Sequence, residues 1–175
     1  MMALNSYKFY KRDGESMRQE NLAKWLKFIF VGVGICGAAV YLYILPELER
    51  RMVQQHPDLY RAYHPWLVLI CITAIPCYIA LVLAWKIAGQ IGRDKSFSME
   101  NASYLKWISV LAAGTAGYFF VGNVILLILN MNPIEMVIRS LLVCFAGVAV
   151  AVAAAALSHL VMKAAELQEQ SDLTI

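Results

Sequence analysis

A polar stripe near the carboxyl terminus is the group of side chains best placed to do chemistry. Its members recur at the spacing of three and four residues that puts side chains on one face of a helix: His159, Lys163, Glu166 and Gln170. Such a face could snorkel at a membrane interface, bind a cytoplasmic partner or, through His159, respond to pH. The sequence leaves these three alternatives open.

An apolar strip accompanies this stripe on the same helix. Leu160, Ala164 and Leu167 carry it, again at helical spacing. We therefore expect the helix to extend beyond the bilayer and to pack either on the protein's own cytoplasmic connector or on a partner.

Acidic and histidine side chains also gather between the first two apolar segments. They are Glu47, Glu49, His56, Asp58 and His64. Their spacing matches no tight ligand motif, and Pro57 interrupts them. The chain also contains no Ser, His and Asp arrangement, no glycine-rich phosphate loop and no paired catalytic carboxylates. The sequence therefore predicts no metal, no cofactor and no enzymatic activity.

Four long segments without a charged side chain must position these groups. They are residues 28–45, 65–85, 107–134 and 140–162. About 20 apolar residues in helix cross the hydrocarbon core of a bilayer, and 61% of the residues are hydrophobic. The fold class predicted is therefore all-α, a polytopic membrane protein with four transmembrane helices. The four cysteines, Cys36, Cys71, Cys77 and Cys144, fall inside these segments and are interpreted as small core residues.

The distribution of basic residues predicts the orientation. Of the 15 Lys and Arg, 11 lie before the first segment, between the second and third, or after the fourth. The positive-inside rule then places both termini in the cytoplasm, around an antiparallel bundle. The expected division is a cytoplasmic segment 1–27, a transmembrane domain 28–162 and a cytoplasmic helix extension and tail 163–175. A net charge of only +3, with acidic residues among the basic ones, predicts no direct binding of nucleic acid.

The connector between the second and third segments has the sequence GRDKSFSMENASYLKW. Gly92 is expected to end one helix, and Ser98 is expected to cap the next. The connector is either a tightly capped turn or a docking surface for a cytoplasmic partner. Lys95, Phe97 and Glu100 would be the contacts of that surface.

The turn between the third and fourth segments is predicted to be very short, near residues 130–132. Asn132 could cap the following helix, with Pro133 at its first position and Glu135 reaching back to the cap. Pro76 lies inside the second segment and removes the amide that would bond the Ile72 carbonyl. We expect a kink there, with Thr73 helping to satisfy the freed group.

Small residues recur along two of the predicted helices, where they allow close backbone approach. They are Gly34 and Ala38 in the first segment and Gly147, Ala151 and Ala154 in the fourth. These faces could pack inside one chain or form a homodimer. Asn123, within the third segment, is interpreted as a partner in an interhelical hydrogen bond. The absence of a charge deep in any segment disfavours a proton-coupled transporter.

Two stretches of the chain resemble a known family. The segment ITAIPCYIALVLAWKIAGQIGRDKSFSMENASYLKWIS and the closing LSHLVMKAAELQEQSDLTI are similar to signature segments of the bacterial domain-of-unknown-function family 2975 of small four-span membrane proteins. The resemblance extends from the first span to Ile175. It implies a location in the bacterial cytoplasmic membrane and a link with small helix-turn-helix regulators, and it supplies no catalytic residues.

Two functional hypotheses follow. One is a regulatory membrane protein whose cytoplasmic connector and carboxyl-terminal helix hold a soluble partner, such as a small helix-turn-helix regulator. The alternative is a structural or transport-associated subunit that self-associates through its small-residue faces. A weaker third possibility is a protein of self-immunity or envelope stress.

Overall fold

The computed structural model describes residues 2–55, 63–93, 96–132 and 134–172, and all of its regular elements are helices. A π-helical turn, Val40–Ile44, joins the first two of them. The α-helices are α1 (Met2–Ala39), α2 (Leu45–Gln55), α3 (Tyr63–Ile91), α4 (Met99–Ile128) and α5 (Ile134–Asp172). Over the described residues the all-helical prediction is confirmed.

Four helical stretches are long and apolar enough to cross a membrane, as the sequence predicts. They are Glu20–Leu48, His64–Ile91, Met99–Ile128 and Met136–Ser171. The first of them is the continuation of a helix that already begins at Met2, so the polar segment 1–27 is helical and continuous with the first span. The helices therefore exceed the uncharged runs at several of their ends.

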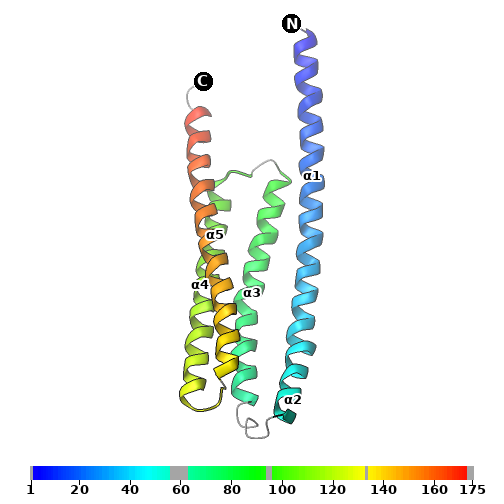
Figure 1. The fold of residues 1–175 in the computed structure, drawn as a ribbon. Helices are drawn as coiled ribbons and strands as arrows, with labels where there is room; N and C mark the ends of the chain where they lie inside the picture. Colours follow the sequence, from blue (N-terminus) through cyan, green and yellow to red (C-terminus); the bar gives the residue numbers. More distant parts are fainter. Residues whose placement is uncertain (1, 56–62, 94–95, 133, 173–175) are drawn as a thin grey trace.

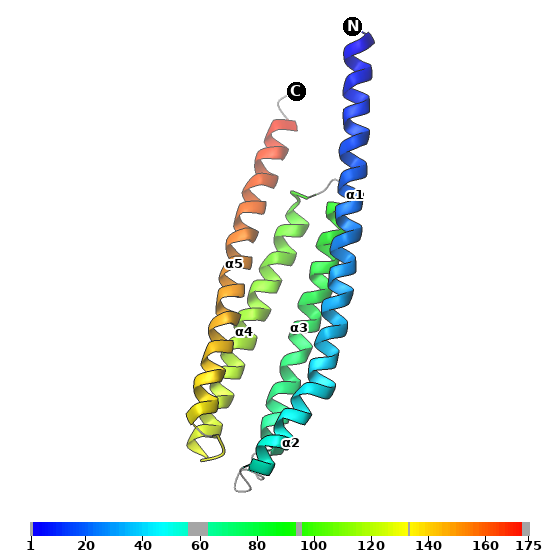
Figure 2. The same ribbon diagram turned by 45° about the vertical axis from the view of Figure 1, so that its right-hand side comes forward.

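The two ends of the bundle differ (Figure 1). The loop between α3 and α4, the first residues of α1 and the last residues of α5 lie at one end, here called the connector end. The turn between α4 and α5 lies at the other, here called the turn end. Figure 2 shows that α1 and α5 both project beyond this loop. The connector end therefore carries most of the helix length that neighbouring helices do not cover.

The turn between α4 and α5 is as short as predicted and has a specific backbone geometry. Asn130 adopts the left-handed conformation, with φ of 53°, which asparagine tolerates better than most other residues. The Met131 amide donates to the Leu126 carbonyl at 2.9 Å, and the Asn130 amide donates to the Leu127 carbonyl at 3.0 Å. These two bonds form a Schellman motif, which ends α4 and directs the chain into α5.

Small side chains line the contact between α4 and α5. Ala116 and Ala151 are buried there, and a Cβ atom on Gly147 would lie 3.1 Å from the Ala116 Cβ. Ser109 Oγ donates to the Ala151 carbonyl at 2.8 Å, which requires close approach of the two backbones. This close approach is the packing that small residues permit in a membrane helix pair.

Pro76 lies inside α3, which continues through it. The sequence predicted that Thr73 would bond the Ile72 carbonyl, but its Oγ1 donates instead to the Ile70 carbonyl, at 2.6 Å. Because that hydroxyl proton is used, the Tyr41 hydroxyl donates to Thr73 Oγ1, over 3.1 Å. Thr73 thus links the π-helical turn to α3, and the kink at Pro76 stays a prediction.

Candidate functional site

The start of α4 fixes the connector to the bundle. Ser98 caps the helix as predicted, because its Oγ accepts a bond from the Asn101 amide at 3.2 Å. Asn101 is the largest fully buried side chain of the described residues, at 1% exposure, and its Nδ2 donates to the Ser96 carbonyl at 3.1 Å. These bonds hold both sides of the Ser98 cap, so the described part of the connector is an ordered turn. Sequence reasoning missed Asn101, although an Asn in the first turn after a Ser cap is a recognisable local signal.

Glu100 is engaged within the protein. Gln90 Nε2 donates to its Oε2 at 2.5 Å, and the Tyr104 hydroxyl donates to its Oε1 at 2.5 Å. The Lys86 ammonium lies 5.5 Å from the centre of the Tyr104 ring, within range of a cation–π contact. These contacts hold the first turn of α4 against the last turns of α3. Both carboxylate oxygens of Glu100 already accept hydrogen bonds within the protein.

The other two predicted contacts of the connector have different outcomes. Phe97 is 59% exposed, so this aromatic ring projects from the turn next to its capping residue. Lys95 lies outside the described residues. Of the three side chains predicted to form the docking surface, Phe97 is thus the described one that is available to contact a partner.

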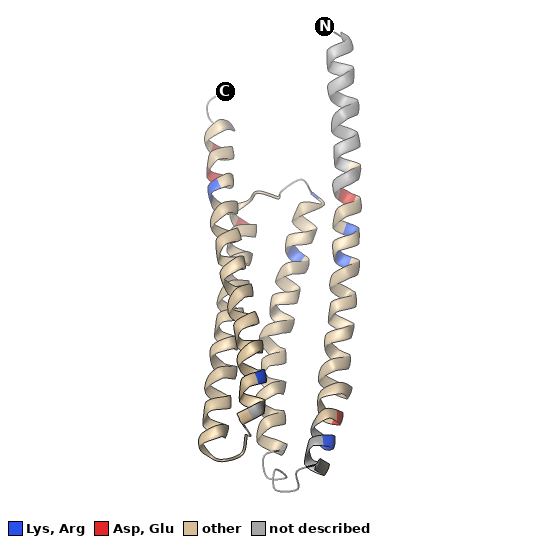
Figure 3. Cartoon of the chain, viewed as in Figure 1, with Lys and Arg blue, Asp and Glu red and all other residues tan. Residues whose placement is uncertain are grey.

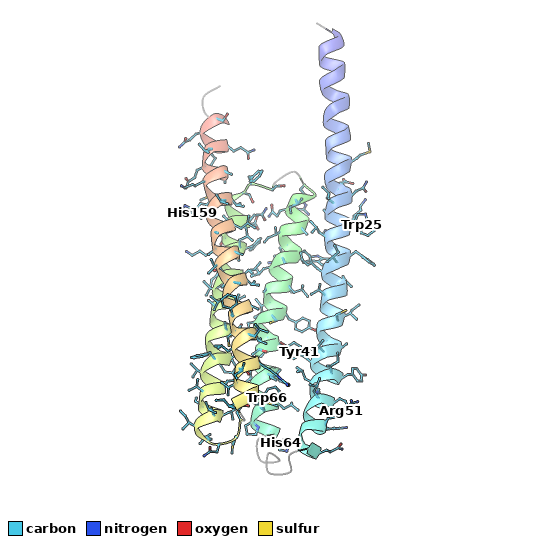
Figure 4. The ribbon with its side chains drawn as sticks, viewed as in Figure 1. Trp25, Tyr41, Arg51, His64, Trp66 and His159 are labelled. Atoms are coloured by element: carbon cyan, nitrogen blue, oxygen red, sulfur yellow. The ribbon has the colours of Figure 1, made fainter. Side chains whose placement is uncertain are left out.

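The polar stripe of α5 lies on its open side. His159, Lys163 and Glu166 are exposed, and Figure 4 shows His159 on the side of α5 away from α1 and α3. Among the described residues these three side chains make no hydrogen bond or ion pair with another residue. The hydrogen bonds and ion pairs of the described residues therefore do not join His159, Lys163 or Glu166 to Glu100 or Phe97.

The packed face of α5 is displaced from the predicted apolar strip. Ser158 Oγ donates to the Ala102 carbonyl at 2.7 Å, and Val161 and Ala165 are buried. Leu160 and Leu167 are 63% and 66% exposed. The strip therefore does not close the protein's own bundle, because the smaller side chains beside it fit the narrow space against α4.

A close contact between α1 and α3 completes the connector end. A Cβ atom added to Gly92 would lie only 2.8 Å from the Ala23 Cβ, and Ala23 is buried. The Lys27 ammonium lies 5.8 Å from the centre of the Trp85 ring. Sequence reasoning did not identify Ala23, because a single alanine in a polar helix carries no distinctive pattern.

The predicted packing residues lie mainly between helices of the same chain. Ala151 and Ala154 are buried, and Gly147 faces Ala116 of α4. Gly34 faces Leu81 of α3, where the Tyr78 hydroxyl also donates to the Gly34 carbonyl at 2.9 Å. Ala38 is half-buried.

Asn123 joins α4 to the start of α5, as an interhelical hydrogen-bond partner. Its Oδ1 accepts from Asn132 Nδ2 at 3.0 Å and from Ser140 Oγ at 2.8 Å, and its own Nδ2 donates to the Phe119 carbonyl at 2.8 Å. Asn132 was expected to cap α5, but its Oδ1 accepts no hydrogen bond. That part of the prediction was wrong, because the buried Asn123 oxygen takes the Asn132 side chain inward. Pro133 and the Glu135 side chain lie outside the described residues.

No group of three or more potential metal ligands occurs among the residues that the structure describes. Of the loop residues weighed as ligands, His56 and Asp58 fall in the undescribed segment 56–62. The four cysteines are free thiols, with Cys144 buried against α4 and the other three exposed. The described side chains supply exposed surfaces and packing contacts between helices.

Comparison with known proteins agrees with this arrangement. The model of the family described as "Protein of unknown function (DUF2975)" matches residues 47–175, which include α3, the connector, α4 and α5. The chain belongs to the DUF2975 family. The whole of α1 lies outside the match, so the family model covers the connector and the α5 extension but not α1.

A relative in Bacillus subtilis (strain 168) extends the comparison into α1. It is YoaS, described as an uncharacterized membrane protein, and it is 30% identical over 155 residues, which cover 86% of this chain and 96% of YoaS. No solved structure matches. Together with the four candidate spans, this relationship identifies the DUF2975 chain as a multi-pass membrane protein.

Proposed function

We propose that this DUF2975 protein is a non-enzymatic regulatory protein of the bacterial cytoplasmic membrane, which binds a soluble cytoplasmic protein at its connector end. The four helices would form an antiparallel bundle with both termini in the cytoplasm. The charge distribution supports this orientation, because 11 of the 15 basic residues belong to the segments at that end.

The observation that carries the proposal is the projection of two helices beyond their neighbours. Ala23 of α1 packs against Gly92 at the end of α3, so α1 projects by residues 2–22, about 30 Å at 1.5 Å per residue. α5 continues for residues 166–172, about 10 Å, past Ala165, its last buried residue. An isolated helix of such length is marginal in water, so a partner would supply burial that stabilises it.

The chemistry of the last turns of α5 suits a protein surface. Leu160 and Leu167 are exposed beside the charged Lys163 and Glu166. Figure 3 shows opposite charges close together near this end of α5. Apolar anchors flanked by charges are typical of an interface that combines burial with electrostatic selection. A small helix-turn-helix regulator is the partner that we expect, on the family resemblance alone.

The deletion of residues 168–175 tests this function. That segment lies beyond Ala165, the last buried residue of α5, so its removal should leave the fold intact and abolish recovery of the soluble partner in affinity purification from mild detergent. Combining Lys163→Glu with Glu166→Lys should weaken recovery in a salt-dependent way.

The matched control lies at the turn end. Glu47 and Arg51 form an exposed ion pair of 3.1 Å on α2, and exchanging their charges should leave recovery unchanged. Recovery of the same soluble protein by the truncated and the full chain would rule out the α5 extension as the binding element. Recovery of integral membrane proteins alone would favour the self-associating or transport-associated alternative.

A further inference from the structure

A cavity of about 790 Å³ opens between the helices in the middle and turn-end part of the bundle. Its walls come from the end of α1 and the π-helical turn, from α3 between Trp66 and Ala80, from α4 between Ile108 and Phe119, and from α5 between Met136 and Val150. On α5 the lining spans 15 residues from Met136 to Val150, about 22 Å along the axis. The cavity is therefore elongated along the helices.

The polarity of the lining changes along this length. The wall toward the connector end is apolar, with Gly37, Ala80, Ile108 and Val150. Among the lining residues that the structure describes, the single charged one, Arg139, lies toward the turn end. This gradient matches a molecule with one charged end and one apolar end.

Arg139 is an exposed residue without a counter-ion among the side chains that the structure describes. Among the described residues it makes no ion pair and no hydrogen bond. It lies in the second turn of α5, inside the stretch long and apolar enough to span a membrane. A basic group at such a position is costly unless an anion or water satisfies it, and its planar guanidinium suits a bidentate carboxylate.

Trp66 supplies a second unsatisfied donor at the same end of the cavity. Its Nε1 is buried and has no hydrogen-bond partner, although a buried indole N–H usually finds one. Figure 4 shows Trp66 nearer the turn end than Tyr41, whose hydroxyl bonds Thr73. The Tyr41 hydroxyl donates to Thr73, and the Thr73 hydroxyl donates to the Ile70 carbonyl. The donors in the described lining that still lack an acceptor are therefore those of Arg139 and Trp66, near the turn end.

We propose that this cavity binds a fatty acid, with its carboxylate at Arg139 and its single chain directed toward the middle of the bundle. The volume lies within the range of about 300 to 1,000 Å³ in which one small ligand is held, which favours a single chain over a two-chain phospholipid. The one cation among the described lining residues matches one negative charge. The proposal does not depend on partner binding at the connector end.

Photocrosslinking competition tests the site on the full chain in nanodiscs of phosphatidylcholine. The probe is palmitic acid with a diazirine in mid-chain, and the competitors are unlabelled palmitic acid and hexadecanol, which has the same chain without the charge. In the unchanged protein, crosslinks should map to α3, α4 and α5 around the cavity. Arg139→Gln should raise the palmitate concentration needed for half-maximal competition by about 10- to 100-fold and leave that of hexadecanol unchanged.

Three variants keep the result interpretable. Arg139→Lys retains the charge and should show a smaller loss. Ala112→Phe fills the apolar part of the cavity and should weaken both competitors. Arg51→Gln removes an exposed arginine that already has Glu47 as its partner and should change neither. The helical circular dichroism of each variant checks that it is folded.

Three results would overturn the proposal. One is equal competition by palmitate and hexadecanol in the unchanged protein. Another is an Arg139→Gln variant that keeps its full preference for palmitate. The third is displacement of the probe by phosphatidylglycerol as efficient as by palmitate, which would assign the cavity to ordinary bilayer lipid.

Discussion

Replacing Asn123 by Leu should lower the free energy of unfolding by about 1 to 3 kcal/mol, because it leaves a buried donor without an acceptor. Asn123 is 2% exposed and accepts bonds from Asn132 and Ser140. Ser140 can still donate to the Met136 carbonyl, at 2.8 Å. Among the described residues, Asn132 Nδ2 donates to the Asn123 oxygen and to no second acceptor, so it would lose its partner. An SDS titration of the protein in micelles, followed by circular dichroism, measures the change.

Two further variants separate the unsatisfied donor from the loss of an ordinary bond. Ser140→Ala removes one bond and leaves Asn123 paired with Asn132, so it should cost less, near the average of about 0.6 kcal/mol for a hydrogen bond between membrane helices. Adding Asn132→Leu to Asn123→Leu removes the orphaned donor and should restore part of the lost stability. Equal losses for Asn123→Leu and Ser140→Ala would show that Asn132 carries none of the cost.

Gly92→Ala should destabilise the connector end by about 1 to 3 kcal/mol through overpacking. The added methyl group would meet the Ala23 Cβ at 2.8 Å, so α1 and α3 must separate there. Gly92 does not have a positive φ, so the substitution introduces no left-handed strain. The reduced flexibility of the unfolded chain offsets only about 0.4 to 1 kcal/mol of this cost. The same titration gives the magnitude.

The partner substitution makes the contact specific. Ala23→Gly removes the opposing methyl group and costs about 1 kcal/mol of helix propensity. In combination with Gly92→Ala it should recover part of the overpacking loss, so the double-mutant cycle should give a favourable coupling. Strictly additive effects would contradict direct packing of α1 on the end of α3. Gly114→Ala is the control, because a Cβ atom there meets nothing within 4 Å.

Features with a local physical cause could be predicted from the sequence. The spans follow from runs of apolar residues, and the Ser98 cap follows from a hydroxyl placed before an acidic first turn. The short turn follows from an asparagine that accepts a positive φ at position 130. Each of these depends on a few adjacent residues and on the solvent around them. Tertiary packing could therefore not override them.

Features that depend on the register between helices could not be predicted. Leu160 and Leu167 have the spacing of a packed face, but the smaller Val161 and Ala165 fit against the neighbouring helix. Asn132 has the right sequence position for a cap, yet the distant Asn123 takes its side chain. The place of Arg139 in a cavity could not be predicted, because it depends on residues from several helices.

Cysteine accessibility in intact cells tests most directly the claim that the connector end faces the cytoplasm. Cysteines introduced by Ser96→Cys and Ser171→Cys should resist a membrane-impermeant maleimide and react after permeabilisation, whereas Gln54→Cys on α2 should react in intact cells. Ser171 and Gln54 are exposed, and Ser96 is half-buried. The parent chain, which keeps its natural cysteines, gives the background labelling. Labelling of the cysteines at positions 96 and 171 in intact cells, with the one at position 54 protected, would contradict the orientation and with it the proposed binding of a cytoplasmic partner.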